Sequence, residues 1–259
     1  MTTEQADLQT LNGGAAMNNR KAWARIVVGL ALGLLVAPLL AACGTGGRVG
    51  ELRTESQSVE LGDADSVRVE IEMGAGDLVL TGGAQDLLEA DFTYNVDKLA
   101  PSVEYSDGAL VVSQPEVGGV PALQGLKDFR NEWDLRLQDG VPMELTLNMG
   151  AGTSDLRLAG LSLTGLDVNL GAGLSTIDLT GDWSNDLEAA IETGAADLTV
   201  RLPRDVGVRV EVDAGPTTVS APDLTQDGNV FTTAAYGSAE VNLRIDISAG
   251  VGLIKLALE

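Results

Sequence analysis

The tripeptide Gly-Ala-Gly recurs along this sequence, and it constrains the fold more than any other feature. Complete or near-complete copies occupy residues 74–76, 150–152, 171–173, 194–196, 213–215 and 248–250. From the second copy onward, the central alanines are 21, 23, 19 and 35 residues apart. A period near 21 residues predicts structural repeats that stack on one another, because a repeat this short cannot bury its own apolar face.

Each copy lies between two segments in which apolar and polar residues alternate, such as 145–149 and 166–170. Alternation predicts strands with one buried face. We therefore expect each repeat to contain a strand of five or six residues, a Gly-Ala-Gly corner, a second strand and a polar turn. Strands that stack lie about 4.8 Å apart, so side chains at the corners would crowd, and glycine removes the crowding. The predicted fold is an all-β repeat, a β-solenoid; the alternative is an antiparallel β-sandwich or roll.

The alternation weakens near residue 115, where Gly118, Gly119 and Pro121 follow closely. Upstream, Asp107-Gly108 between two short apolar runs predicts a hairpin. The expected organisation is a signal peptide (1–42), a flexible tether (43–60), an N-terminal β unit (61–115), a loop and connecting strand (116–142) and the repeat array (143–259). The apolar C-terminal segment 253–258 is expected to pair back onto the N-terminal unit, in preference to leaving an open edge.

The N-terminal region has the pattern of a bacterial lipoprotein signal. Arg20, Lys21 and Arg25 precede an uncharged apolar run of 15 residues, 26–40, which is shorter than a spanning helix requires. The run ends in the lipobox-like sequence Leu40, Ala41, Ala42 and Cys43. This resemblance implies cleavage before Cys43 and lipid attachment to its sulfur; a single-pass anchor is the alternative. Because residues 1–16 are polar and acidic, we expect translation to begin at Met17.

Composition excludes several classes of function. The formal net charge is −22, and residues 43–259 carry 13 basic and 36 acidic side chains. Such a surface repels nucleic acid, so no nucleic-acid partner is expected. The chain has no histidine and one cysteine, which removes the usual general base and the usual transition-metal ligands. We expect no enzyme activity, no cofactor and no metal.

Three kinds of candidate site were considered. Asp155, Asp178 and Asp197 follow their corners at different offsets, whereas a calcium-binding repeat needs a fixed offset. Gly-Ala-Gly precedes no helical pattern, which argues against a phosphate loop. Trp183 lies in a polar turn, so we retain it as a speculative ligand contact, while Trp133 heads an alternating strand and is expected in the core.

The run 69–80, the segment 133–137 and the two complete Gly-Ala-Gly repeats together resemble the bacterial toast-rack domain. That family is related to the cell-wall-active antibiotic response proteins and to adhesin-like families with repeated β rungs. The resemblance covers roughly residues 60–259. It implies a β-stranded domain of the cell envelope with no established catalytic site.

These observations predict a lipid-anchored, extracytoplasmic binding or scaffold module of the bacterial cell envelope. Its partners would be the membrane, through the lipid on Cys43, and an envelope polymer or surface protein. Gly44 follows the cysteine in place of an inner-membrane retention aspartate, so an outer-membrane location fits if the cell has one. The alternative function is a regulatory component of a cell-envelope stress response.

Overall fold

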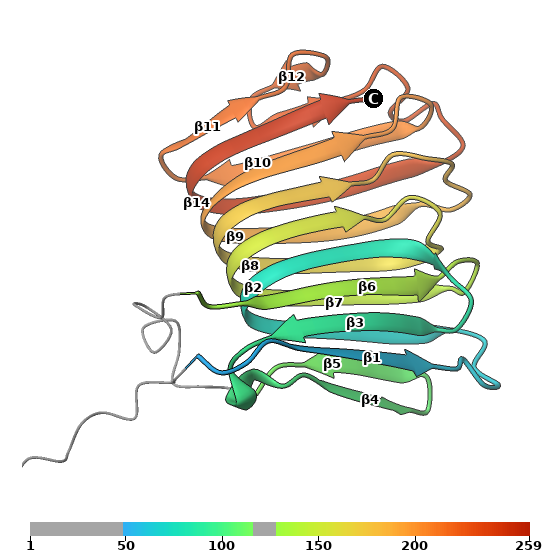
Figure 1. The fold of residues 1–259 in the computed structure, drawn as a ribbon. Helices are drawn as coiled ribbons and strands as arrows, with labels where there is room; N and C mark the ends of the chain where they lie inside the picture. The colour runs from blue at the N-terminus through green and yellow to red at the C-terminus, as the bar shows by residue number, and fades with distance from the viewer. Residues whose placement is uncertain (1–48, 116–127) are drawn as a thin grey trace, which may run out of the picture. The chain divides into compact units, whose positions relative to one another are not determined.

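Five long parallel strands dominate the computed structural model, which describes residues 49–115 and 128–259. They are β2 (Val67–Ala84), β7 (Met143–Arg157), β8 (Leu163–Asp178), β9 (Leu187–Leu202) and β14 (Asn242–Leu258). Each contains one Gly-Ala-Gly copy and bends there, so that its two halves lie on opposite faces of the stack (Figure 1). The expected pair of short strands joined by a corner is thus one continuous strand, because the register continues unchanged across the bend and only the first glycine of each copy lacks a paired residue.

The repeats align in register across the strands. Ala75 of β2 pairs with Ala151 of β7, which pairs with Ala172 of β8, and Ala172 pairs with Ala195 of β9. Ala195 then pairs with Val251 of β14, so the copy on β14 is Gly250-Val251-Gly252 and lies two residues after the position expected from the sequence, 248–250. On β10 the first glycine is likewise Gly215, which lies against Gly250. In-register stacking of equivalent positions is what the 21-residue period predicts.

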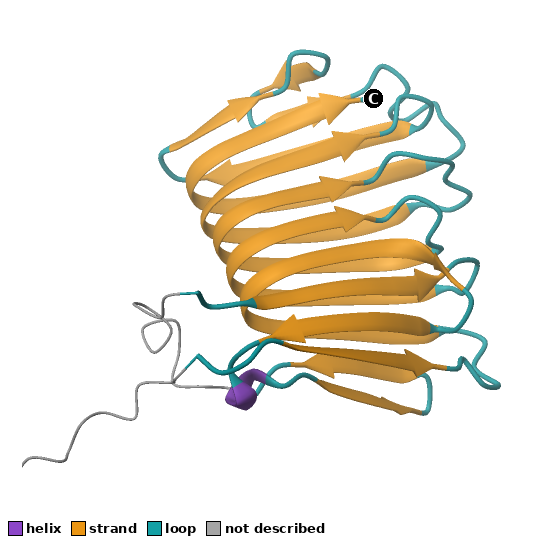
Figure 2. Ribbon diagram, viewed as in Figure 1, coloured by secondary structure: helices purple, strands orange, loops and turns teal. Residues whose placement is uncertain are grey.

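The remaining strands extend this sheet at both ends, and the described strands form a single mixed sheet of 14 (Figure 2). At the N-terminal end are β1 (Arg53–Val59), β3 (Leu88–Tyr94), β4 (Ser102–Ser106), β5 (Ala109–Ser113) and β6 (Asn131–Gln138). At the C-terminal end are β10 (Gly207–Ala214), β11 (Thr217–Ser220), β12 (Thr225–Asp227) and β13 (Val230–Thr232). A three-residue 3-10 helix, η1 (Asp97–Leu99), completes the described elements. The predicted all-β class is confirmed.

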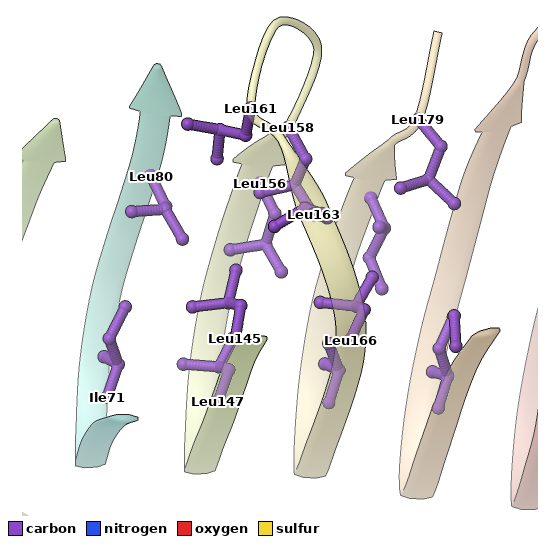
Figure 3. Packing of buried hydrophobic residues seen from close by; sticks show 14 of the residues in the cluster. Ile71, Leu80, Leu145, Leu147, Leu156, Leu158, Leu161, Leu163, Leu166 and Leu179 are labelled. Atoms are coloured by element: carbon purple, nitrogen blue, oxygen red, sulfur yellow. The ribbon is translucent and has the colours of Figure 1, made fainter. Parts of the chain in front are cut away.

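The two faces enclose one apolar core, filled by the inward-pointing residues of the alternating strands. Figure 3 shows part of it, where Leu145, Leu147 and Leu156 of β7 lie beside Ile71 and Leu80 of β2. The core runs without a break from β3 to β14. Residues 61–115 and 143–259 therefore share one core and one sheet, and no separate core lies on the N-terminal side of residue 115.

At the N-terminal end, the structure corrects the predicted tether and confirms the predicted hairpin. Residues 43–60 were expected to be a flexible tether, yet Arg53–Val59 forms strand β1 and pairs antiparallel with β3. Its polar side chains stay exposed, so the strand is held by backbone hydrogen bonds rather than by burial, and the apolar pattern gave no sign of it. The predicted hairpin is present between β4 and β5, with positive φ at Asp107 and Gly108.

The C-terminal segment does not pair with the N-terminal unit, so that prediction was wrong. The stretch Leu253–Leu258 pairs with Asp197–Leu202 of β9, and the first half of β14 lies between β9 and β10. Pro216 separates β10 from β11, and proline lacks the N–H that a central strand must donate. The interrupted pair β10 and β11 therefore occupies the end of the stack, and the uninterrupted β14 lies inside it.

The described residues include no helix that is both long and apolar enough to cross a membrane.

Candidate functional site

A groove of about 1180 Å³ runs along the bend of the stack. It crosses six strands, from β2 through β7, β8, β9 and β14 to β10. The groove is open to solvent, and its floor is the backbone around the first glycine of each repeat, beside the apolar side chains of Met73, Met149 and Leu170. We call it the bend groove.

Glycine leaves the groove empty, and the stacking of strands requires glycine there. A Cβ added to Gly150 would overlap the carbonyl oxygen of Gly74, and one added to Gly171 would overlap that of Gly150. Glycine is favoured at the second position for an additional reason, because Gly152 and Gly173 adopt φ values of +137° and +138°. Other residues rarely adopt that conformation. The first position is glycine on every strand that crosses the groove, whereas the second is Ala196 on β9, so the requirement for glycine is strict only at the first position.

A column of polar side chains forms one rim of the bend groove. On each strand, the residue two positions before the first glycine pairs with the equivalent residue of the neighbouring strand. The column consists of Glu72, Asn148, Asn169, Glu192, Ser248 and Asp213. We call it the polar ladder. Within it, Nδ2 of Asn169 donates a hydrogen bond of 3.0 Å to Oδ1 of Asn148.

Two side chains close the groove at β2, where the next strand along the stack is interrupted between β5 and β6. The backbone N–H of Gly74 donates to Oε1 of Gln114 (3.2 Å), and Nδ2 of Asn131 donates to the carbonyl oxygen of Ala75 (2.6 Å). Asn131 is buried, and its Oδ1 accepts a 3.0 Å hydrogen bond from the indole of Trp133. These side chains satisfy backbone groups that a neighbouring strand satisfies elsewhere in the stack.

The bend groove carries negative charge only. Glu72, Glu192 and Asp213 are the charged residues in its described lining, and all three are exposed. The arginines on the outer face of the same sheet are paired elsewhere. Arg209 contacts Glu211 at 2.6 Å, which lowers the pKa of the Glu211 carboxyl, and Arg244 lies 3.8 Å from Glu188. A ligand in the groove would therefore meet hydrogen-bond acceptors and no fixed cation.

The polar ladder is not among the sites predicted from the sequence, although the sequence contains its signal. A polar residue precedes the first glycine position by two in every copy, as in Asn148-Met-Gly and Asn169-Leu-Gly. We had interpreted these residues only as the outward half of the strand alternation. The alternation does not show that glycine at the next outward position leaves a groove beside them.

The residues singled out from the sequence lie away from the bend groove or outside the described part. Lipidation at Cys43 and the lipobox Leu40, Ala41 and Ala42 fall outside the described residues. Trp183 is half-buried against the core, and its indole donates a 2.8 Å hydrogen bond to the carbonyl of Leu179. These contacts are those of a side chain that covers the core.

Trp133 is 1% exposed, and its ring meets that of Phe92 edge to face, with centroids 5.3 Å apart. The predicted core position is confirmed.

The three candidate aspartates occupy different register positions. Asp155 pairs with Arg157, Asp178 contacts Arg201 at 3.5 Å, and Asp197 accepts a 3.1 Å hydrogen bond from the backbone of Leu253. Within residues 49–115 and 128–259, no three acidic or cysteine side chains are placed to hold a metal ion.

Comparison with known proteins places this fold among related domains. A crystal structure described as a putative cell adhesion protein from Clostridium sporogenes ATCC 15579 is 28% identical, with a TM-score of 0.74. The match covers 81% of this chain and 100% of that one. A structure described as a putative adhesin from Bacteroides fragilis NCTC 9343 is 12% identical, with a TM-score of 0.32, covering 80% and 97% of the two chains. A search of curated proteins finds no match.

The family described as the N-terminal domain of toast_rack, DUF2154, matches residues 48–201, which is more than half of the chain. That span includes the strands from β1 to β9 and the Gly-Ala-Gly bends of β2, β7, β8 and β9. The protein therefore belongs to the toast-rack family.

Proposed function

We propose that this protein is a lipid-anchored, extracytoplasmic binding or scaffold module of the bacterial cell envelope, adhesin-like and without enzyme activity. Its stacked strands form a β-solenoid whose rungs are about 21 residues long. The lipid on Cys43 holds the module at the membrane, and the bend groove binds an extended envelope polymer. The lipobox, the toast-rack family and the fold likeness to a structure described as a putative cell adhesion protein support this proposal.

The bend groove is the observation that carries the binding function. It is long and open, it crosses six strands, and its rim places one polar side chain on each strand. A compact small molecule is normally enclosed on most of its surface. An open, repeating groove instead suits a chain that extends along it and gains its affinity from many equal contacts.

The chemistry of the groove supports a binding role rather than catalysis. Its described lining contains no histidine, cysteine, lysine or tyrosine, which are the side chains that most often act as nucleophile or base beside carboxylates. The three acidic groups are exposed on separate strands. Hydrogen bonding to a bound polymer requires only the acceptors that are present.

The binding proposal can be tested by co-sedimentation of the soluble part of the chain with purified peptidoglycan sacculi, at low and high salt. We expect the protein to be retained. Asn169→Arg places a long cation in the middle of the groove and should lower retention about tenfold or more. Thr153→Arg adds the same charge at an exposed position of β7 outside the groove lining and should leave retention unchanged.

Two results would contradict the proposal. If the unaltered protein is not retained on sacculi at either salt concentration, the polymer-binding function fails. If Asn169→Arg and Thr153→Arg are retained equally, the groove is not the binding surface.

The anchoring proposal has a separate test, which is fractionation of cells that express the full chain. Cys43→Ala removes the sulfur that accepts the lipid, so the variant should be released from membranes or remain uncleaved. A single buried acyl chain gives marginal attachment, whereas two or three give durable attachment. Unchanged processing and fractionation of Cys43→Ala would refute lipid anchoring.

A further inference from the structure

We propose that the ligand of the bend groove is an unbranched glycan without anionic groups, which lies along the stack with about one sugar on each strand. This inference rests on the proposed polymer-binding function and names the class of polymer. It comes from three properties of the groove: the spacing of the polar ladder, the chemistry of its groups, and its charge.

Spacing is the first property. Consecutive residues of the polar ladder belong to neighbouring strands, which lie about 4.8 Å apart. One pyranose unit of an extended glycan spans about one such step, so each sugar would meet an equivalent rim position. A bound chain of this kind would stay in step with the ladder from Glu72 to Asp213.

An extended peptide fits less well. It rises about 3.3 Å per residue and directs successive side chains to opposite sides, so it falls out of step with the strands. Peptides that bind sheets usually add a strand to a free edge. The inner strands that cross the groove, β7, β8, β9 and β14, pair with neighbours on both sides around the bend, so most of the floor offers no such edge.

Chemistry is the second property. Asn148 and Asn169 each offer an amide, which both donates and accepts hydrogen bonds, and Glu72 and Glu192 offer carboxylate oxygens that accept them. Hydroxyl groups do both, so a row of sugar hydroxyls matches this rim. The floor of glycine backbone carries no side chains, so the C–H groups of a sugar ring can approach the Cα atoms of these glycines closely.

The described lining of the groove includes no aromatic ring. Affinity would therefore come from repeated hydrogen bonds instead of ring stacking, and would depend strongly on the length of the chain.

Charge is the third property. The groove holds three carboxylates and no basic side chain in its described lining, within a chain of net charge −22. Polymers with phosphate or uronic acid groups would be repelled by these carboxylates. Neutral sugars, and amino sugars with free amines, meet no such penalty.

The test is calorimetric titration of the lipid-free chain with a ladder of N-acetylglucosamine oligomers, from the dimer to the octamer. Affinity should rise about tenfold from the dimer to the hexamer and then level off, because six strands cross the groove. A polygalacturonate oligomer of equal length should not bind. An oligolysine peptide of equal length tests for a cationic peptide as the occupant.

Variants link the length dependence to the ladder. Replacement of both Asn148 and Asn169 by alanine should weaken hexamer binding about fivefold or more, with the thermal unfolding midpoint checked to show that the fold is intact. Thr153→Ala is the matched control, because Thr153 is exposed on β7 beyond the bend. It should leave hexamer binding unchanged.

The outcomes separate this inference from the proposed function. Retention on sacculi without binding of peptide-free glycan oligomers leaves the proposed function standing and overturns the glycan assignment. Tighter binding of polygalacturonate or oligolysine than of the hexamer overturns it too, as does affinity that does not depend on length. Loss of both sacculus and oligomer binding overturns both proposals.

Discussion

Nδ2 of Asn131 donates a 2.6 Å hydrogen bond to the carbonyl oxygen of Ala75, at the bend of β2, where the neighbouring strand is interrupted between β5 and β6. Asn131 is 2% exposed, and its Oδ1 accepts a hydrogen bond from the indole N–H of Trp133, two residues further along the chain. A side chain thus takes the place of the backbone donor that the next repeat would supply. The stack ends here with its polar groups satisfied.

Replacement of Asn131 by alanine should be strongly destabilising. The change leaves the carbonyl of Ala75 and the indole N–H of Trp133 without these partners in a buried site, so we expect a loss of about 2–3 kcal/mol in the free energy of unfolding. Urea unfolding measures this quantity. Asn185→Ala, in an exposed loop, is the control and should change stability by less than about 0.5 kcal/mol. Equal effects of the two substitutions would show that Asn131 does not cap the stack.

The steric role of the first glycine can be tested within one strand. Gly171→Ala places a Cβ against the carbonyl oxygen of Gly150, and backbone cannot move aside cheaply, so we expect a loss of about 2 kcal/mol or more. A Cβ at Gly165, also on β8, would meet only Cγ of Glu144 at 3.5 Å. Gly165→Ala should therefore be neutral or slightly stabilising. Thermal or urea unfolding measures the stability of both variants. A Gly171→Ala variant as stable as Gly165→Ala would refute the steric explanation.

Ser154 and Ser175 form a buried pair between β7 and β8, with their Oγ atoms 2.7 Å apart. Each is the other's hydrogen-bond partner among leucines of the core. Ser154→Ala alone should cost about 1–2 kcal/mol because it leaves the hydroxyl of Ser175 unpaired. The double substitution should cost less than either single one, since no buried hydroxyl remains. A double-mutant cycle measures the coupling, and simple additivity of the two changes would contradict this expectation.

Tyr94 links β3 to the edge strand β1, because its hydroxyl donates a 2.6 Å hydrogen bond to Oε1 of Glu55. That hydrogen bond, together with burial and the negative charge of Glu55, raises the pKa of the Tyr94 phenol above 10.0. A raised phenol pKa stabilises the fold fully below pH 10, and this stabilisation is lost as the pH rises through the pKa of the folded state. At pH 7, Tyr94→Phe should therefore cost about 1 kcal/mol.

Above pH 10 the difference between Tyr94→Phe and the unaltered protein should shrink. Urea unfolding at several pH values measures it, and Tyr105→Phe serves as the control. Spectrophotometric titration should also show that one of the three tyrosines ionises late and that this late ionisation is missing in Tyr94→Phe. A pH-independent difference would show that Tyr94 has an ordinary pKa.

Much of the fold follows from local pattern. The alternation around each Gly-Ala-Gly copy specified which residues face the core, and all of Val69, Ile71, Leu145 and Leu147 are buried as expected. The pattern could not reveal β1, whose residues are polar on both faces and which pairs with β3 through its backbone and through polar side chains such as Glu55. The pattern also predicted a break between two strands at each Gly-Ala-Gly copy. A sequence shows that glycine has no side chain, but it does not show that the strand register continues across the glycines.

The candidate site was recoverable only in part. Asn148 and Asn169 are separated by one repeat, so their stacking follows from the period. The period does not predict that the neighbouring glycines form a groove. The depth of the groove depends on how sharply each strand bends and on Gln114, which closes one end of the groove. Residues 114 and 131 belong to no repeat, so the period does not predict where they lie.

The sequence by itself determined the repeating strand, its buried face and the need for glycine at each bend, since these depend on side chains that are neighbours within one repeat or stack at equivalent positions. Only the tertiary structure decided the order in which the strands stack. Equivalent apolar faces on β9, β10 and β14 leave several orders open, and the first half of β14 takes the place between the other two. The physical reason is the completeness of backbone pairing: β14 pairs along both of its halves, whereas Pro216 interrupts the strand after β10 and confines it to the end of the stack.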